Sequence, residues 1–250
     1  MTYSREQCQE LDLTDPLKAF REHFALPDGE IYLDGNSLGV LPKGVSARAV
    51  ETIEAQWGQQ LIRAWNKSDW MGLPMVLGDR IAPFIGVEKG TIATGDTLSI
   101  KVYQALAAAL KMRPGRSVIL SDRNNFPSDL YMAQGLVGTL GESHRLELAD
   151  ADSVLDALSD EVAVVMLTHV DYRTGRLYDM DAVTRRVHKA GAVMIWDLAH
   201  SAGAMALDLS SCSTGPPRFA IFSAVNIVFG TGGPGGLYLD SVYPSEQTGS

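Results

Sequence analysis

The stretch VAVVMLTHVD at residues 162–171, together with AVMIWDLAHSAG at residues 192–203, decides the fold. Each stretch begins with a run of apolar residues and ends in polar side chains. Between them, residues 180–190 place apolar side chains at the spacing of a helix. A buried strand, a helix and a second buried strand in succession predict two parallel strands joined by a crossover helix.

The same alternation extends toward the N-terminus, with Pro114-Gly115 as a clear breaker between two segments. Apolar periodicity predicts further strands at 117–120 and 145–148, and helices at 16–23, 43–65, 97–113, 127–140 and 151–158. The predicted fold class is therefore α/β, with a mainly parallel sheet covered by helices on both faces.

Length and composition exclude several classes of protein. The chain has 250 residues, of which 46% are hydrophobic and 20% charged, and this is typical of a globular protein. A formal net charge of −9 disfavours binding to nucleic acid. The two cysteines make a disulfide framework improbable, and no apolar run approaches the roughly 20 residues that span a bilayer. We expect a cytoplasmic protein without a signal peptide or a membrane partner.

Polar clusters follow three of the predicted strands. They are SDRNNFPSD at 121–129, THVD at 168–171 and DLAHSAG at 197–203. Because ligands of open α/β sheets gather at the carboxyl ends of the strands, the three clusters predict one crevice. It would be lined by an aromatic ring, two carboxylates, hydroxyl groups and an imidazole.

Asp197 and His200 are the strongest candidates for chemistry in this crevice. A carboxylate directly after a buried strand often only caps the next element, and a lone histidine is more often structural. The spacing of Asp197, His200 and the following Ser-Ala-Gly favours a carboxylate that faces a cationic ring nitrogen.

Two glycine-containing segments are weaker candidates. TGDTLS at 94–99 opens a helix, whose free N–H groups attract anions, although capping by Thr97 or Ser99 explains it equally well. GTGGPGG at 230–236 indicates a turn and fits no dinucleotide pattern. The sequence contains neither a Walker motif nor a zinc-type His/Cys spacing, so we expect no nucleoside triphosphate and no metal site.

Five motifs, in this order along the chain, resemble those of kynureninases. The motifs are YLDGNSLG at 32–39, WG at 57–58 with LIRAWN at 61–66, NFPSD at 125–129, MLTHV at 166–170 and WDLAHSAG at 196–203. The resemblance covers residues from about 10 to 236 and implies a pyridoxal-phosphate (PLP) enzyme of fold-type I. Such enzymes are homodimers, and they hydrolyse L-kynurenine or 3-hydroxykynurenine to anthranilate or 3-hydroxyanthranilate and L-alanine, in tryptophan catabolism.

The resemblance also implies roles for individual residues. Asp197 would pair with the pyridine nitrogen, Phe126 would stack on the ring, and Thr168 and His200 would contact its polar edge. The backbone N–H groups of Thr97 and Leu98 would hold the phosphate. The remaining residues that the resemblance implies are Pro127, Ser128 and Asp129 for the cofactor, with Ser128 and Asp129 at the phosphate, and Asp34, Asn36 and Ser37 at the substrate entrance.

The sequence departs from the kynureninase pattern near its end. Asn226 stands where the family carries the lysine that forms a Schiff base with PLP, and an amide cannot form that bond. We expect the small domain of the family, with the basic group for the substrate carboxylate that the resemblance implies, to be absent. We expect an N-terminal segment with the entrance loop at 1–45, an incomplete PLP-binding domain at 46–240 and a disordered tail at 241–250.

Two alternatives follow from these departures. The chain could be a non-catalytic remnant of the PLP fold that serves as an interaction partner. It could also be another PLP lyase of the same group, such as a cysteine desulfurase, which would need a reactive cysteine. Cys212 is the candidate for that thiol, although a buried or idle thiol is the more common case.

Overall fold

The computed structural model describes residues 2–210, 218–223 and 235–239. The α-helices are α1 (Arg5–Thr14), α2 (Val45–Glu51), α3 (Gly58–Gln60), α4 (Ala64–Lys67), α5 (Leu73–Ile81), α6 (Leu98–Lys111), α7 (Pro127–Leu140) and α8 (Met180–Lys189). The strands are β1 (Phe24–Ala25), β2 (Leu41–Pro42), β3 (Ile92–Gly95), β4 (Val118–Asp122), β5 (Arg145–Ala149), β6 (Val162–Thr168), β7 (Val193–Asp197), β8 (Arg218–Ser223) and β9 (Gly235–Leu239). Short 3₁₀ turns are η1 (Lys18–His23), η3 (Leu61–Arg63), η4 (Ala82–Phe84) and η5 (Val154–Ala157), and η2 (Thr52–Trp57) is a π-helix.

The larger sheet has seven strands in the order β3-β9-β8-β7-β6-β4-β5. The five strands from β8 to β5 are parallel, and β9 is antiparallel to both of its neighbours. This confirms the predicted α/β class with a mainly parallel sheet. Strand β3, which the sequence pattern did not predict, lies at the edge of the described sheet and pairs with β9.

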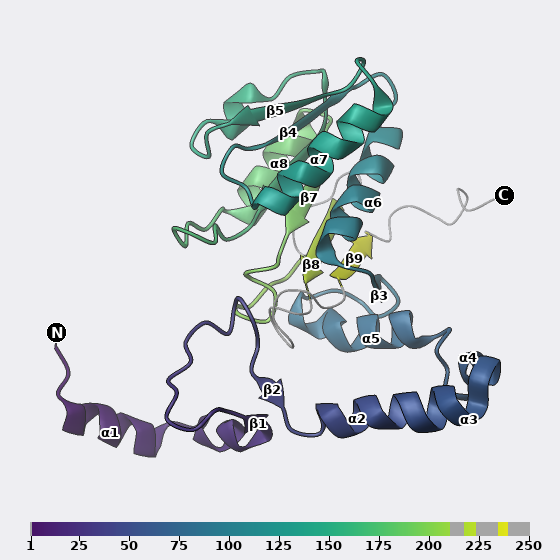
Figure 1. Cartoon of the computed structure of the whole chain (residues 1–250). Helices are drawn as coiled ribbons and strands as arrows, with labels where there is room; N and C mark the ends of the chain where they lie inside the picture. The colour runs from purple at the N-terminus through teal and green to yellow at the C-terminus, as the bar shows by residue number, and fades with distance from the viewer. Residues whose placement is uncertain (1, 211–217, 224–234, 240–250) are drawn as a thin grey trace.

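Helices cover both faces of the sheet, as Figure 1 shows. On one face, α6 and α7 pack their apolar sides against strand residues such as Ile119, Val164 and Ile195. On the other, α8 and η5 pack against the alternate residues, among them Leu120 and Trp196. Since side chains alternate along a strand, each buried strand contributes to both cores.

The N-terminal part of the chain departs from the predicted pattern. The helix expected at 43–65 is divided among α2, η2, α3, η3 and α4, and Leu61 has a positive φ of 52° that ends helix α3. Its apolar residues Val50, Ile53 and Trp57 are exposed, whereas Ala64 is buried. In Figure 1 this arm lies along the lower side of the α/β body.

Two further expectations were wrong in extent. The helix expected at 151–158 forms only the short turn η5, and the pattern at 16–23 forms only η1. Helix α1 was not predicted, although Ser4 and Gln7 form a capping box at its start. In the part of the chain that the structure describes, no helix has both the length and the apolar character to cross a membrane.

Candidate active site

The carboxyl ends of the parallel strands bring the three predicted clusters to one edge of the sheet. Strand β6 ends at Thr168 and β7 at Asp197, and these two residues are partners in register. Because β9 is antiparallel to both β8 and β3, β3 also ends at this edge and leads there into α6. The predicted convergence of strand ends is therefore confirmed.

A directional chain of hydrogen bonds underlies this edge. Ser121 Oγ donates to the Met166 carbonyl (2.7 Å), and Asn125 Nδ2 donates to Ser121 Oγ (3.1 Å). Asn125 Oδ1 accepts from Thr168 Oγ1, whose hydroxyl also lies 3.1 Å from Asp197 Oδ2. A hydroxyl has one proton, so Asn125 and Asp197 share it and fix the orientation of Thr168.

Asp197 is almost completely buried at the end of β7, with 1% of its surface exposed. Its Oδ1 accepts a hydrogen bond from the backbone N–H of Ala199 (2.8 Å). Burial raises the pKa of Asp197 above its ordinary value, whereas the Ala199 N–H, the charge of His200 and the Thr168 hydroxyl act in the opposite direction. The carboxylate thus caps the turn that follows the strand and also takes part in the hydrogen-bond chain through Thr168.

A second carboxyl group, that of Asp129, lies beside Asp197. Asp129 is the third residue of α7 and is fully buried. Within the described residues, neither of its carboxyl oxygens has a partner at hydrogen-bonding distance and angle. Burial raises the pKa of Asp129 well above its ordinary value, and the neighbouring charge of Asp197 raises it further. Two adjacent buried acids favour a cationic group between or beside them.

Three rings form an aromatic cluster in front of these acids. Phe126, directly before α7, meets Tyr172 edge-on at 5.0 Å between ring centroids and lies 6.3 Å from His200. Tyr172 stacks on His200 at 6.4 Å and 26°. Phe126 and His200 were predicted site residues. Tyr172 and Asn125 were not, although Asn125 stands within a predicted cluster and Tyr172 directly follows another.

The expected entrance loop reaches this cluster. Strands β1 and β2 pair at its base, and the Tyr32 hydroxyl donates to the carbonyls of Asp34 (2.9 Å) and Leu38 (2.6 Å) to fold its tip. Asn36 Nδ2 lies 2.5 Å from His200 Nδ1. Within the described residues, Asn36 is the one predicted entrance residue with a hydrogen bond to the cluster that follows β7. Asp34 and Ser37 are exposed.

The remaining predicted residues lie at two helix starts. Thr97 is the N-cap of α6, but its side chain makes no capping hydrogen bond, and Leu98 is the first residue of the helix. Pro127 is exposed and Ser128 half-buried at the start of α7. The first N–H groups of a helix have no partner within it, so both starts can hold an anion.

Several predicted features fall outside the described residues. These are Asn226, Cys212, the tail at 241–250 and residues 230–234 of the glycine-rich turn. Among the residues that the structure does describe, no group of three or more His, Cys, Asp or Glu side chains is placed to hold a metal ion.

Comparisons with curated proteins point in one direction. The chain is 50% identical over 237 residues to a kynureninase of Burkholderia pseudomallei (strain 1106a), and 44% identical to a kynureninase of Pseudomonas fluorescens. Each alignment covers 93% of this chain and 56% of the relative. The chain therefore spans about half the length of the curated relatives it matches.

Solved structures share the fold at low sequence identity. One is a mutant of the C-DES protein with glycine covalently linked to its PLP cofactor, with a TM-score of 0.66, 20% identity, and coverage of 96% of this chain and 60% of that one. Another is the cysteine desulfurase CsdA of Escherichia coli, with a TM-score of 0.64, 21% identity, and coverage of 88% and 57%. The family model for aminotransferase class-V matches residues 79–239. With the parallel sheet and the crevice at its edge, this match shows that the chain belongs to the aminotransferase class-V family.

Proposed function

We propose that this chain binds PLP and acts, like the kynureninases it resembles, on L-kynurenine or 3-hydroxykynurenine. The products would be anthranilate or 3-hydroxyanthranilate and L-alanine. The observation that carries the proposal is the buried pair of Asp129 and Asp197 at the carboxyl end of β7. The protonated ring nitrogen of PLP is a cation that fits this pair, and when bound the ring supplies an electron sink for bonds at the substrate's α carbon.

The other predicted residues surround the place where such a ring would bind. Phe126 would cover one face of the ring, and Thr168 and His200 would bind its polar edge. The N–H groups of Thr97 and Leu98 would hold the phosphate, with Ser128. For Asp129 the position beside Asp197 supports a role on the ring-nitrogen side in place of the expected phosphate contact.

The protein's own residues would then control charge and orientation. Asp197 would keep the ring nitrogen protonated, because a buried carboxylate stabilises the adjacent cation. Thr168 orients Asp197 through its hydroxyl group, which also donates a hydrogen bond to Asn125 Oδ1. Asn36 would hold His200 at the entrance, where it can contact a small-molecule substrate.

A second candidate function is non-catalytic PLP binding, and Asn226 is the observation that favours it. The amide cannot make the covalent bond that a lysine makes with PLP, and no lysine follows Lys189 in the chain. In this case the cofactor is held only by its ring and phosphate contacts, and the chain acts as the partner of another subunit.

We also propose that the chain forms a homodimer in the cytoplasm, with a PLP-binding domain from residue 46 to 240. Exposed apolar side chains along the N-terminal arm, including Ile53 and Trp57, support an association of this kind. The acidic balance of the chain supports a small-molecule function over one at nucleic acid.

The test is titration of the purified 250-residue chain with PLP, monitored by absorbance, followed by borohydride reduction and peptide mapping. We expect saturable binding that Asp197→Asn weakens by about tenfold or more, because a hydrogen bond to a charged group contributes about 1.5–3 kcal/mol. Asp160→Asn is the matched control, since it removes an exposed carboxylate away from the crevice.

The outcomes separate the two candidates. A borohydride adduct on one of the seven lysines, with release of anthranilate from kynurenine, supports the kynureninase function. Saturable binding without an adduct or product supports non-catalytic PLP binding. Absence of binding, or equal affinity in the Asp197 and Asp160 variants, contradicts both.

A further inference from the structure

Tyr172 joins the two other rings of the aromatic cluster in front of the buried acids. Its ring meets Phe126 edge-on, with 5.0 Å between centroids and 67° between planes, and it stacks on His200 at 6.4 Å and 26°. Phe126 and His200 lie 6.3 Å apart and are tilted by 46° to each other. Tyr172 therefore contacts both of the rings to which the proposed function gives a role at the cofactor.

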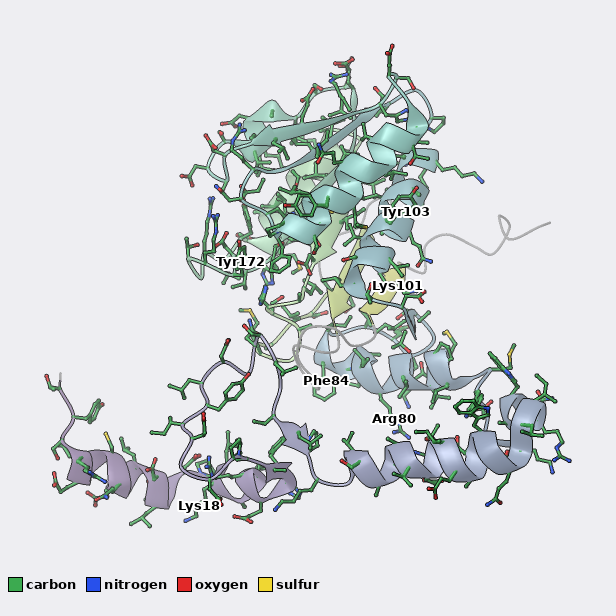
Figure 2. The ribbon with its side chains drawn as sticks, viewed as in Figure 1. Lys18, Arg80, Phe84, Lys101, Tyr103 and Tyr172 are labelled. Carbon is green, nitrogen blue, oxygen red and sulfur yellow. The ribbon has the colours of Figure 1, made fainter. Side chains whose placement is uncertain are left out.

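The Tyr172 ring also lines a pocket with residues of the hydrogen-bond chain. Asn125, Phe126 and Thr168 contribute to the wall of the same pocket. The Thr168 hydroxyl is the group that lies between Asn125 and Asp197. In Figure 2, Tyr172 lies at the edge of the α/β body that faces the N-terminal arm. These contacts place the ring of Tyr172 at the crevice itself.

The loop between β6 and α8 carries Tyr172 and is closed by its own backbone. Val170 and Leu177 form an isolated antiparallel bridge. The Asp171 N–H donates to the Arg176 carbonyl, with 2.9 Å between nitrogen and oxygen. These contacts close a tight loop, and Tyr172 stands in the part that they enclose.

The carboxylate of Asp171 fixes the backbone around Tyr172. Its Oδ1 accepts from the backbone N–H of Arg173 (2.9 Å) and from the N–H (2.7 Å) and hydroxyl (2.9 Å) of Thr174. Burial acts to raise the pKa of Asp171, but the bonds from Thr174 and Arg173 together bring it below its ordinary value. The guanidinium carbon of Arg173 lies 5.4 Å from the centroid of the Tyr172 ring, and this cation–π contact restrains the ring further.

We propose that Tyr172 is a positioning residue of the cofactor site, which holds Phe126 for its contact with the face of the PLP ring and His200 for its contact with the polar edge. The assignment rests on the proposed function, which gives Phe126 and His200 these contacts. Aromatic pairs at such centroid distances contribute beyond the area that they bury. Without Tyr172, both side chains gain freedom that binding of the ring has to remove again, and affinity for the ring falls.

The test compares PLP with pyridoxal, which has the same ring but no phosphate, by absorbance titration of the 250-residue chain. We expect Tyr172→Leu to weaken both ligands by the same factor of about fivefold, because the lost restraint acts on the ring contacts alone. Since Tyr172 is 43% exposed, this change leaves the core intact. Tyr172→Phe keeps the ring and should restore the affinity that Tyr172→Leu loses.

Two further measurements separate positioning from a general effect on the fold. The visible circular dichroism of PLP, measured at saturation, should be smaller in Tyr172→Leu, because the cofactor ring is then held less firmly in one orientation. In a chain that carries Phe126→Leu, the loss caused by Tyr172→Leu should fall to about twofold, since only the contact with His200 remains.

Tyr131→Leu is the matched control, because Tyr131 is an exposed aromatic residue of α7 that lines a different pocket, beside β5. Equal affinity of the wild-type and Tyr172→Leu chains overturns the assignment. A loss that PLP shows and pyridoxal does not, or an undiminished loss in the Phe126→Leu chain, also overturns it. A wild-type chain that binds neither ligand overturns the proposed function as well, whereas PLP binding that Tyr172→Leu leaves unaffected overturns only the role of Tyr172.

Discussion

Asp129 is a buried carboxyl group whose ionised form is disfavoured by burial and by the neighbouring Asp197. Its carboxyl group is fully buried, and the neighbouring Asp197 adds a like charge beside it. A raised pKa in the folded state means that the folded chain holds this proton to higher pH than the unfolded chain does. Stability from this group is thus complete below the unfolded pKa of about 3.9 and decreases as pH rises through the folded pKa.

Asp129→Asn should therefore stabilise the cofactor-free chain at neutral pH. The amide N–H can donate to Asp197, and a hydrogen bond to a charged acceptor contributes about 1.5–3 kcal/mol. We expect a higher free energy of unfolding in urea at pH 7, and a smaller difference between variant and wild type at pH 4. Asp160→Asn should change neither value. If the free energy of unfolding of Asp129→Asn depends on pH as that of the wild type does, the interaction between Asp129 and Asp197 is contradicted.

Sequence reasoning identified the site residues that directly follow a strand. It missed those that a folded loop returns to the edge of the sheet. Asp197 and His200 follow a buried strand directly, so their position at the sheet edge follows from the alternation of strands and helices. Tyr172 reaches the same cluster only because Asp171 folds the loop after β6, and this depends on three-dimensional hydrogen bonding. The contact between Asn36 and His200 joins residues 164 positions apart, which no local pattern encodes.

The start of α6 is the element that we expect to distinguish PLP from its unphosphorylated form. Thr97 caps it without a side-chain hydrogen bond, so its first N–H groups remain for an anion. Leu98→Pro removes one of these N–H groups at a position where proline fits a helix. We expect PLP affinity to fall by about tenfold while pyridoxal affinity is unchanged.

Leu98→Ala controls for the lost side chain in that experiment, because Leu98 packs against the core on this face of the sheet. Both affinities are measured by absorbance titration. If Leu98→Pro and Leu98→Ala bind PLP alike, the helix start does not hold the phosphate.

At the level of elements, burial determines how well the pattern predicts structure. β6 and α7 occupy the predicted residues 162–168 and 127–140. In each, the apolar side chains recur at the period of the strand or helix and pack into the core. The segment 43–65 has a helical period as well, but Val50, Ile53 and Trp57 are exposed in the described chain, and the π-helix η2 interrupts the α-helix. Periodicity alone gives no information about what covers a face.

At the level of the whole molecule, the exposed arm should control association. Ile53 and Trp57 are 55% and 63% exposed, so replacing both with glutamate removes apolar contact area without disturbing a core. We expect the wild-type chain to elute as a dimer in light-scattering chromatography and Ile53→Glu/Trp57→Glu as a monomer with an unchanged circular dichroism spectrum.

Tyr131→Glu is the control for that pair, because it places the same charge on an exposed aromatic residue of α7, 65% exposed and away from the arm. Dimerisation that survives the double substitution, or that Tyr131→Glu abolishes equally, contradicts an interface on the arm.

The position of β9 determines the order in which the chain can fold. β3 emerges from the ribosome early, at residues 92–95, yet its partner among the described strands is β9, at residues 235–239. Until those residues are synthesised, β3 cannot join the sheet and β8 presents an open edge, and unpaired edges of this kind invite aggregation. During synthesis, the parallel strands from β4 to β7 can assemble first, whereas recruitment of β3 waits for β9, which pairs with both β8 and β3.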